Sequence, residues 1–355
     1  MKIVCLIDGL GLGGAQRQII GLVKGLKSRG YEACLVYYCD SNFYYNYAIA
    51  QGIDCFGLKI QGSRMSKIIG VHSFINSKKP DVLISYIDGA NVIACLYKLF
   101  HPKVKVIISE RNTTQDESRL IKLQYWIYNL ANYVVPNSIS QLNYIKCKHP
   151  RLGRKAIAIT NFTDTDSFVV KDRTLSSKKE ILTVGRIGEQ KNVLRYIEAV
   201  KIVHERTNVL FTIKWVGNIF DDEYYNKCLK LIYEYKLQDI FKFSKTTNSV
   251  IDEYETADYF CLPSIYEGFP NVLCEALSCG LPVACSDVCD NPTIVEQGIN
   301  GYLFNPWSTT SIAEGLISLL NLEGSNYLSM SNINREKAVC NLSIERFITK
   351  YENLF

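Results

Sequence analysis

"SIYEGFPNVLCEALSCGLPVACSD", at residues 264–287, contains the signals of a turn, a helix and a strand in succession. Pro270 and Asn271 suit the start of a helix, because proline lacks the N–H group that is unpaired in the first turn. Gly280 suits the helix end, and the apolar run at 282–286 predicts a strand. A helix enclosed by two apolar runs predicts a βαβ unit with a parallel sheet.

The same alternation of short apolar runs and helical patterns continues through the chain. Strands are expected at 3–7, 33–38, 81–86, 104–109, 180–184, 211–216, 259–263 and 282–286, and helices at 15–28 and 193–206. Such runs are typical of a parallel sheet that is covered on both faces. The alternation stops in a polar segment and then restarts, so we predict two α/β domains in tandem with a boundary near 160–179. A length of 355 residues suits two domains.

Composition and charge exclude several classes of protein. The net charge of +5 is too small for a dedicated nucleic-acid binder but suits a protein that handles anionic ligands. The 13 cysteines form no C-x-x-C pair, which indicates reduced thiols in a cytoplasmic protein. A zinc site is the alternative, although the spacing of Cys274, Cys279, Cys285 and Cys289 fits no usual ligand pattern. We expect neither a signal peptide nor a membrane span.

Two glutamates lie beside an expected anion site in the quoted stretch. The helix that begins near Asn271 directs backbone N–H groups and the positive end of its dipole toward a ligand, and Gly268 allows a close approach. Glu267 and Glu275 are better suited to accept hydrogen bonds from hydroxyl groups on either side of a phosphate. A nucleotide-sugar has that layout. The alternative is an ordinary strand–turn–helix segment with exposed glutamates.

A second segment, "ILTVGRIGEQKN" at 181–192, places two cations after a predicted strand. Arg186 and Lys191 lie in a turn with Gly185 and Gly188. Ligands of open α/β sheets bind beyond the carboxyl ends of strands, where these cations would neutralise a diphosphate leaving group. Two surface charges in a loop are the alternative.

Together these motifs resemble the retaining nucleotide-sugar glycosyltransferases of family 4, which have the GT-B fold. The resemblance rests on "GLGGAQR" at 11–17, "VGRIGEQKN" at 184–192, "EGFPNVLCEALSCGLPV" at 267–283 and "VEQGINGYLF" at 295–304. It implies two Rossmann-like domains facing across a cleft. It also implies an acceptor-side domain at 1–165, a donor domain at 166–340, and a helix at 341–355 that returns to the first domain.

The resemblance also implies roles for individual residues. Arg186, Lys191 and Glu267 would be catalytic, with the two cations holding the donor diphosphate and Glu267 the sugar hydroxyls. Glu275 would bind the ribose. The other donor-binding residues would be Gly13, Gly14, Gly268, Phe269, Pro270, Asn271 and Val272. The resemblance implies no cofactor and no metal.

One segment departs from the family pattern. Many members carry a histidine after a strand of the first domain, where this sequence has "VIISERNTT" at 106–114. We hypothesise that Glu110 or Arg111 contacts the sugar or acceptor instead, the alternative being a loop positioned by salt bridges. The "SERN" letters also resemble members that transfer N-acetylhexosamines or galactose from UDP-sugars during surface-glycan assembly.

Other functions remain open from the sequence. Gly9, Gly11 and Gly14 satisfy G-x-G-x-x-G, and Asp40 follows the second strand, which together would suit an NAD-dependent oxidoreductase. A catalytically silent nucleotide-sugar-binding protein of the same fold is a further alternative.

The expected partners are a nucleotide-sugar donor, a glycan or lipid-linked acceptor and an anionic membrane contacted peripherally, with no nucleic acid. The basic run at 146–155 is interpreted as a solvated surface, with a patch for anionic lipid as the alternative. An apolar helical stripe, made of Leu120, Leu123, Trp126, Ile127 and Leu130, is interpreted as core rather than membrane contact.

Overall fold

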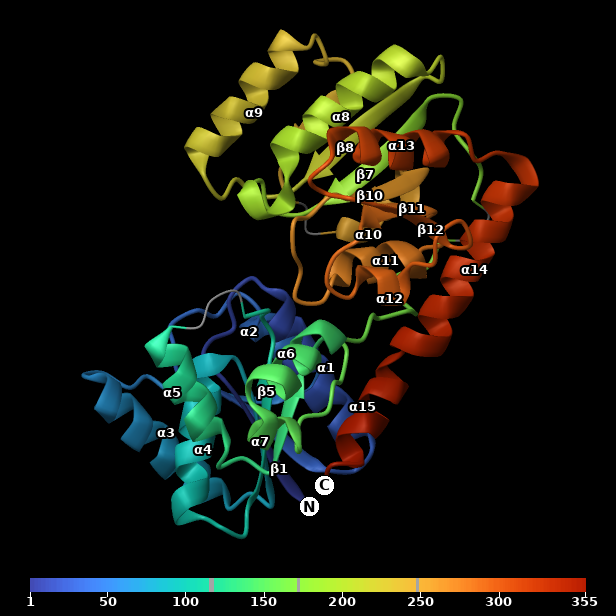
Figure 1. Ribbon diagram of the computed structural model, residues 1–355. Coiled ribbons are helices and arrows are strands. Elements are labelled where there is room, and N and C mark those ends of the chain that lie inside the picture. The colour runs from blue at the N-terminus through green and yellow to red at the C-terminus, as the bar shows by residue number, and fades with distance from the viewer. Residues whose placement is uncertain (115–117, 171–172, 247–248) are drawn as a thin grey trace. The chain divides into compact units, whose positions relative to one another are not determined.

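The computed structural model describes residues 1–114, 118–170, 173–246 and 249–355. It divides into two compact units, which are described separately (Figure 1). The first unit comprises Met1–Phe162 and Ile344–Phe355, and the second comprises Thr163–Ser343.

The first unit is a parallel sheet of six strands in the order β3-β2-β1-β4-β5-β6. Its elements are β1 (Lys2–Ile7), α1 (Gly14–Ser28), β2 (Glu32–Tyr37), α2 (Tyr45–Ala50), β3 (Asp54–Gly57), α3 (Arg64–Lys78), β4 (Val82–Tyr86), α4 (Asp88–Phe100), β5 (Lys105–Glu110), α5 (Arg119–Tyr128), β6 (Tyr133–Pro136), α6 (Ile139–Lys148), α7 (Pro150–Gly153) and α15 (Ile344–Glu352). Two separate apolar clusters, one for each face of the sheet, form its core.

The second unit repeats this design with the order β12-β11-β10-β7-β8-β9, also parallel. Its elements are β7 (Lys179–Val184), the 3-10 helix η1 (Glu189–Lys191), α8 (Val193–Arg206), β8 (Phe211–Val216), α9 (Asp222–Glu234), β9 (Phe241–Ser244), α10 (Val250–Thr256), β10 (Tyr259–Leu262), α11 (Asn271–Ser278), β11 (Val283–Ser286), α12 (Asn291–Ile294), β12 (Gly301–Phe304), α13 (Thr309–Leu320) and α14 (Gly324–Leu342). Counted along the chain from the first strand of each unit, both sheets have the Rossmann order 3-2-1-4-5-6. The predicted fold class is confirmed.

All eight strands expected from the sequence are present within one or two residues. The four strands that were not predicted, β3, β6, β9 and β12, are the outermost strands of the two sheets. Each has only four residues. The inner strands β10 and β11 are equally short but fully buried, whereas every outer strand has at least one residue that is not buried. Outer strands pair on one side only, so their local apolar signal is weaker.

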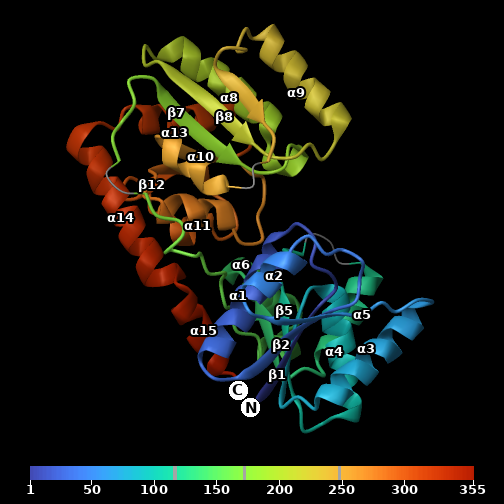
Figure 2. The ribbon, with the colours of Figure 1, turned by 180° about the vertical axis from the view of Figure 1, so that it is seen from behind.

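The last helix, α15, packs on α1 in the first unit, as Figures 1 and 2 show. The approach is close at Gly25, where a Cβ atom would lie 2.2 Å from Cδ1 of Ile348. Arg111 donates a hydrogen bond to the hydroxyl of Tyr351 at 2.8 Å, and Tyr86 bonds the same hydroxyl at 2.9 Å. Polar and apolar contacts therefore both fix the end of the chain to this unit.

The apolar stripe near residue 120 is not the core face that the sequence analysis expected. Leu120, Leu123 and Trp126 are exposed by 78%, 53% and 71%. Ile127 and Leu130 do pack against the core. The deeply buried positions of α5 are Tyr125 and Tyr128, whose hydroxyls find hydrogen-bond partners inside the unit. Because both tyrosine hydroxyls have hydrogen-bond partners inside the unit, the helix buries the face that carries Tyr125 and Tyr128. Part of its aliphatic face is left exposed to solvent.

The basic run at 146–155 is largely a solvated surface, as interpreted. Lys146, Lys148, Arg151 and Arg154 are exposed. Lys155 is the exception, because its ammonium donates to the carbonyls of residues 129 and 131 at 2.5 and 2.6 Å. No helix in the described part of the chain is long and apolar enough to span a membrane.

Candidate functional site

The candidate site lies where the strand order of the second sheet reverses. Strands β7 and β10 pair as neighbours, although two other strands, β8 and β9, lie between them in the sequence. The loops that follow them therefore meet at one sheet edge, the usual ligand position in open α/β sheets. The amide of Ile265 donates to the carbonyl of Gln190 at 2.8 Å, and the side-chain amide of Gln190 donates to the carbonyl of Tyr266 at 2.9 Å.

This junction brings together the predicted cation Lys191 and the predicted carboxylate Glu267. The Lys191 ammonium donates to Oε1 of Glu267 at 2.5 Å, and the two side chains are only 13% and 10% exposed. Gly185 makes room for the lysine, because a Cβ atom there would lie 3.1 Å from Cε of Lys191. The alternative of two surface charges in a loop is therefore wrong for Lys191.

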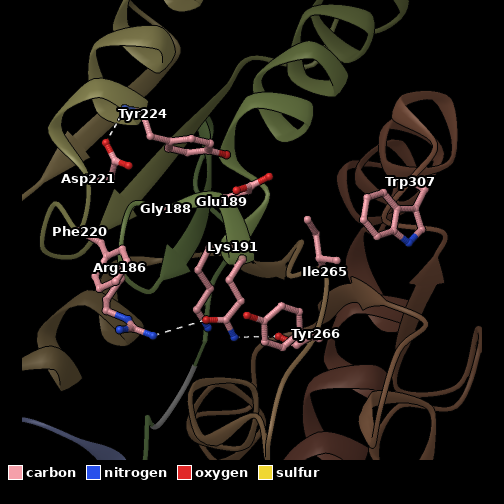
Figure 3. A pocket seen from close by; sticks show the side chains of 11 residues that line it. Arg186, Gly188, Glu189, Lys191, Phe220, Asp221, Tyr224, Ile265, Tyr266 and Trp307 are labelled. Atoms are coloured by element: carbon pink, nitrogen blue, oxygen red, sulfur yellow. Dashed lines mark hydrogen bonds between the residues drawn. The ribbon is translucent and has the colours of Figure 1, made fainter. Parts of the chain in front are cut away.

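Arg186, in contrast, is exposed at the cavity mouth. Its guanidinium lies 4.9 Å from the ring centroid of Phe220 and donates to the side chain of Gln190 at 3.4 Å (Figure 3). These contacts hold the cation near Lys191 and leave it in contact with solvent. An anionic ligand would thus meet one largely buried cation, Lys191, and one exposed cation, Arg186.

Glu275 lies one turn into α11 and is only 4% exposed, while Glu267 is 7% exposed. The alternative of solvent-exposed glutamates is therefore wrong. The hydroxyl of Tyr254, on α10, donates to Oε2 of Glu275 at 3.0 Å and fixes the carboxylate from behind. The sequence analysis missed Tyr254, and no motif connects it with Glu275.

The start of α11 agrees with the expected phosphate cradle in its backbone. Pro270 occupies the N-cap, no described side chain caps the helix, and Asn271 is its first residue. Phe269 is only 7% exposed and packs in the hydrophobic core, so its contribution to a ligand would come from the backbone. At the other end Gly280 has φ = +71°, as expected of a glycine after a helix.

Asn192 is a further residue to which the sequence analysis gave no role. It adopts φ = +61° between η1 and α8, and its amide donates to the carbonyls of Pro263 and Pro306 at 3.1 and 2.8 Å. One buried side chain thus ties together the loops that follow β7, β10 and β12. Asparagine tolerates this left-handed conformation better than most residues do, which was the available signal.

A cavity of about 490 Å³ opens beside these loops. Figure 3 shows Tyr224 and Asp221 at a distance from Arg186 and Lys191, with Trp307 to one side. The full lining is Arg186, Gly188, Glu189, Gln190, Lys191, Phe220, Asp221, Tyr224, Ile265, Tyr266 and Trp307. Tyr266 stands in the stretch quoted above, directly before Glu267, but was given no role, and Phe220, Tyr224 and Trp307 come from segments without a recognisable motif.

The remaining predicted site residues belong to the first unit. Gly13 is the N-cap of α1 and Gly14 its first residue, both at the carboxyl end of β1. Arg111 is 7% exposed, donates to Asn161 at 2.6 Å and to Tyr351, and stacks 3.7 Å from the ring centroid of Tyr86. Within the described part of the chain, these contacts fix Arg111 in its own unit through the neutral partners Asn161, Tyr351 and Tyr86.

Glu110 ends β5 and is only 4% exposed. Burial raises the pKa of its carboxyl to about 7, although hydrogen bonds from Gln141 at 2.9 Å and Tyr125 at 3.4 Å favour the charged form. The neighbouring charge of Asp88 raises the pKa further. Whether Glu110 meets a sugar or an acceptor stays a hypothesis.

Among the residues that the structure describes, no group of three His, Cys, Asp or Glu side chains could hold a metal ion. The cysteines proposed as an alternative zinc site are instead unpaired thiols, and Cys274, Cys279 and Cys285 are buried. Burial raises the pKa of each of these three thiols.

Comparison with known proteins agrees with this geometry. Residues 166–337 match the family described as "Glycosyl transferases group 1". A GalNAc-alpha-(1->4)-GalNAc-alpha-(1->3)-diNAcBac-PP-undecaprenol alpha-1,4-N-acetyl-D-galactosaminyltransferase of Campylobacter jejuni is 27% identical, over 78% of this chain and 77% of its own length. A UDP-Gal:alpha-D-GlcNAc-diphosphoundecaprenol alpha-1,3-galactosyltransferase of Escherichia coli is 26% identical, over 57% of this chain and 54% of its own length.

Solved structures share the fold at low sequence identity. Anabaena HepE, solved in complex with UDP, has a TM-score of 0.87, covers 99% of both chains and is 16% identical. The apo form of the lipopolysaccharide outer core galactosyltransferase WaaB has a TM-score of 0.78, covers 100% of this chain and 99% of its own, and is 16% identical. The GT-B prediction is confirmed, and the oxidoreductase alternative is wrong.

Proposed function

Because this chain belongs to the group 1 glycosyltransferases, we propose that it transfers a hexose or N-acetylhexosamine from a UDP-sugar to a hydroxyl of a glycan or lipid-linked oligosaccharide. The observation that carries the proposal is the meeting of Arg186, Lys191 and Glu267 at the strand-order reversal of the second sheet. Two cations and a carboxylate on one edge suit a ligand with a diphosphate and adjacent hydroxyls.

In this proposal the two cations act on the leaving group. The bond between the sugar C1 and the diphosphate oxygen breaks, the acceptor oxygen bonds to C1, and the acceptor proton leaves with the nucleoside diphosphate. Charge develops on the diphosphate as the bond breaks, and preorganised cations stabilise that charge. The transfer retains the anomeric configuration, so that an α-linked donor gives an α-linked product.

Glu267 must change partner when a donor binds. Its Oε1 accepts a hydrogen bond from the Lys191 ammonium. A diphosphate would draw that ammonium toward itself and release the carboxylate to accept sugar hydroxyls. Glu275, held by Tyr254, would accept the ribose hydroxyls, and the uncapped start of α11 would add backbone donors to the phosphates.

The donor and acceptor classes are supported by relatives. HepE was solved with UDP, and both curated relatives described above are named for undecaprenol-linked acceptors. We infer the same classes here, with surface-polysaccharide assembly as the context. Such an acceptor would place the enzyme on the cytoplasmic face of a membrane, in peripheral contact with it. We propose that the reaction needs no metal and no cofactor.

The test is a thermal-shift screen with UDP-, GDP- and ADP-sugars. A ligand that binds the native state at 100 times its Kd stabilises it by about 2.7 kcal/mol, so the correct nucleotide raises Tm and the others do not. If none of the three nucleotide-sugars raised Tm, the result would contradict the proposed donor site.

A product assay separates an enzyme from a catalytically silent binding protein. The donor that raises Tm is incubated with a lipid-linked disaccharide, and UDP release and glycan mass are followed. Binding without transfer or hydrolysis across a panel of such acceptors would favour the silent alternative.

A further inference from the structure

Helix α5 of the first unit presents an apolar face to solvent. Leu120, Leu123 and Trp126 follow one another at intervals of three residues and are 78%, 53% and 71% exposed. Side chains three apart lie on the same side of a helix, so the three form one continuous surface. Exposed apolar surface of this kind on a soluble unit indicates an interaction site.

The helices α5, α6 and α7 themselves carry charge of one sign, although Asp116 and Glu117 directly precede them in the sequence. Between residues 118 and 163 the sequence contains Arg119, Lys122, Lys146, Lys148, Arg151, Arg154 and Lys155 and no Asp or Glu. All of these except Lys155 are exposed. These seven cations exceed the net charge of the whole chain, which is only +5, so the rest of the chain is slightly negative.

A cavity of about 450 Å³ joins the apolar face to the cations. Lys122 and Trp126 of α5 line one side, and Lys148 and Arg151 of α6 and α7 line the other. The ring of Tyr125 stacks on the ring of His149 at 4.1 Å beneath them. The cavity is therefore lined by a stacked pair of aromatic rings and three cationic side chains.

We propose that α5, α6 and α7 form a docking surface for an anionic lipid bilayer. Leucine and tryptophan side chains beside a lysine- and arginine-rich rim are the pattern of a helix that lies in the plane of a membrane interface. The apolar residues enter the boundary between headgroups and acyl chains. The cations meet the lipid phosphates, and Lys122, Lys148 and Arg151 hold one phosphate in the hollow.

Charge complementarity selects this occupant. Each Lys or Arg near an anionic bilayer contributes to binding, and the contribution falls within a Debye length. This docking surface would hold the enzyme at the membrane where the proposed lipid-linked acceptor lies, so its biological meaning rests on the proposed function. Its test, however, needs neither donor nor acceptor, so its failure would leave the transfer reaction standing.

The experiment is flotation of the full chain with vesicles of phosphatidylglycerol and phosphatidylethanolamine, compared with phosphatidylcholine alone. We expect binding to the anionic vesicles, at least tenfold weaker binding to the neutral ones, and loss of the difference at high salt. The charge reversal Lys148→Glu with Arg151→Glu should reduce binding at least tenfold. The change Leu123→Ser with Trp126→Ser should reduce it about tenfold as well.

Matched controls use exposed residues of the second unit. Lys230→Glu with Lys242→Glu repeats the charge change, and Leu210→Ser with Tyr233→Ser repeats the apolar change at residues 70% and 75% exposed. Both controls should bind like the unaltered chain. Circular dichroism verifies that each variant is folded.

A fluorescence measurement tests insertion directly. Brominated lipids should quench Trp126, and Trp126→Phe should remove that quenching while most binding remains. Equal binding to neutral and anionic vesicles, unchanged binding of both α5–α7 variants, or no quenching of Trp126 would each overturn the proposal. Tight binding of an acidic protein with no binding to vesicles would assign the surface to a protein partner instead.

Discussion

The two units of this protein share one sheet order, yet they use the same topological position differently. In the second unit the loops after β7 and β10 carry Arg186, Lys191 and Glu267, and a cavity lies beside them. In the first unit the corresponding loops follow β1 and β4, and the former contains Gly13 and Gly14. Topology brings two loops together at each sheet, and only the side chains on them decide whether the junction can hold an anion.

The first unit keeps its buried charge elsewhere. Glu110 ends β5 and Arg111 follows it, one strand away from the strand-order reversal, and both are buried. Arg111 fastens α15 to its unit, whereas Lys191 in the second unit has a carboxylate partner that a ligand can replace. In the proposed mechanism, a buried cation is thus structural in the first unit and acts on the ligand in the second.

The largest expected effect tests the second unit's junction. Lys191→Ala, or Arg186→Ala, should reduce turnover about 100- to 1000-fold, because each removes a preorganised charge from the departing diphosphate. The measurement is steady-state UDP release with the donor found by thermal shift. Lys24→Ala, at an exposed lysine on α1 of the first unit, is the control and should change little. If both variants kept wild-type turnover, Lys191 and Arg186 would have no part in the mechanism.

The next effect tests the buried carboxylate of the first unit through pH. Glu110 has a pKa of about 7 in the folded state against an ordinary 4.5, so the folded state binds the additional proton. Its contribution to stability is complete below pH 4.5 and is lost as pH rises to about 7, at a cost on the order of 3 kcal/mol.

Glu110→Gln should remove that loss. Denaturant unfolding at pH 4.5 and pH 8 should show that the free energy of unfolding of the variant increases relative to that of the wild type as pH rises. Glu314→Gln, at an exposed glutamate of α13, is the control. If the difference in free energy of unfolding between Glu110→Gln and the wild type were the same at both pH values, the raised pKa of Glu110 would be contradicted.

An intermediate effect separates binding from transfer. Gly14→Leu in the first unit should reduce turnover about tenfold if this glycine lies near the reacting groups, since small misplacements there are costly. Donor affinity, measured by calorimetry with UDP, should fall less than turnover, because most of the other proposed donor-binding residues belong to the second unit. Equal loss of turnover and affinity would count against the proposed role of Gly14.

The smallest effect tests how Glu275 is held. Tyr254→Phe removes the hydrogen bond at 3.0 Å and should weaken UDP binding about fivefold, in keeping with the usual worth of one hydrogen bond. Tyr259→Phe removes a comparable buried hydrogen bond, to the carbonyl of Leu322 at 2.9 Å, away from the site. An equal loss of UDP affinity in both variants would mean that Tyr254 acts only on stability.

Much of the fold could be predicted because inner strands carry their own signal. Strands such as β1 and β8 are buried runs bounded by turns, and their apolar letters suffice. The outer strands are less buried than inner strands of the same length, such as β10, so their letters give a weaker apolar signal. The stripe on α5 was misread for a related reason, since the partners of Tyr125 and Tyr128 come from distant segments.

The sequence by itself determined the two α/β units and pointed to Arg186, Lys191, Glu267 and Glu275 as candidate site residues, because glycine turns and charged residues after apolar runs are local patterns. Only the tertiary structure decided which of them meet. It paired Lys191 with Glu267, placed Tyr254 behind Glu275, joined three loops through Asn192, and turned Leu120, Leu123 and Trp126 outward. The physical reason is that hydrogen bonds and burial depend on neighbours in space, and sheet order brings distant segments of the chain together.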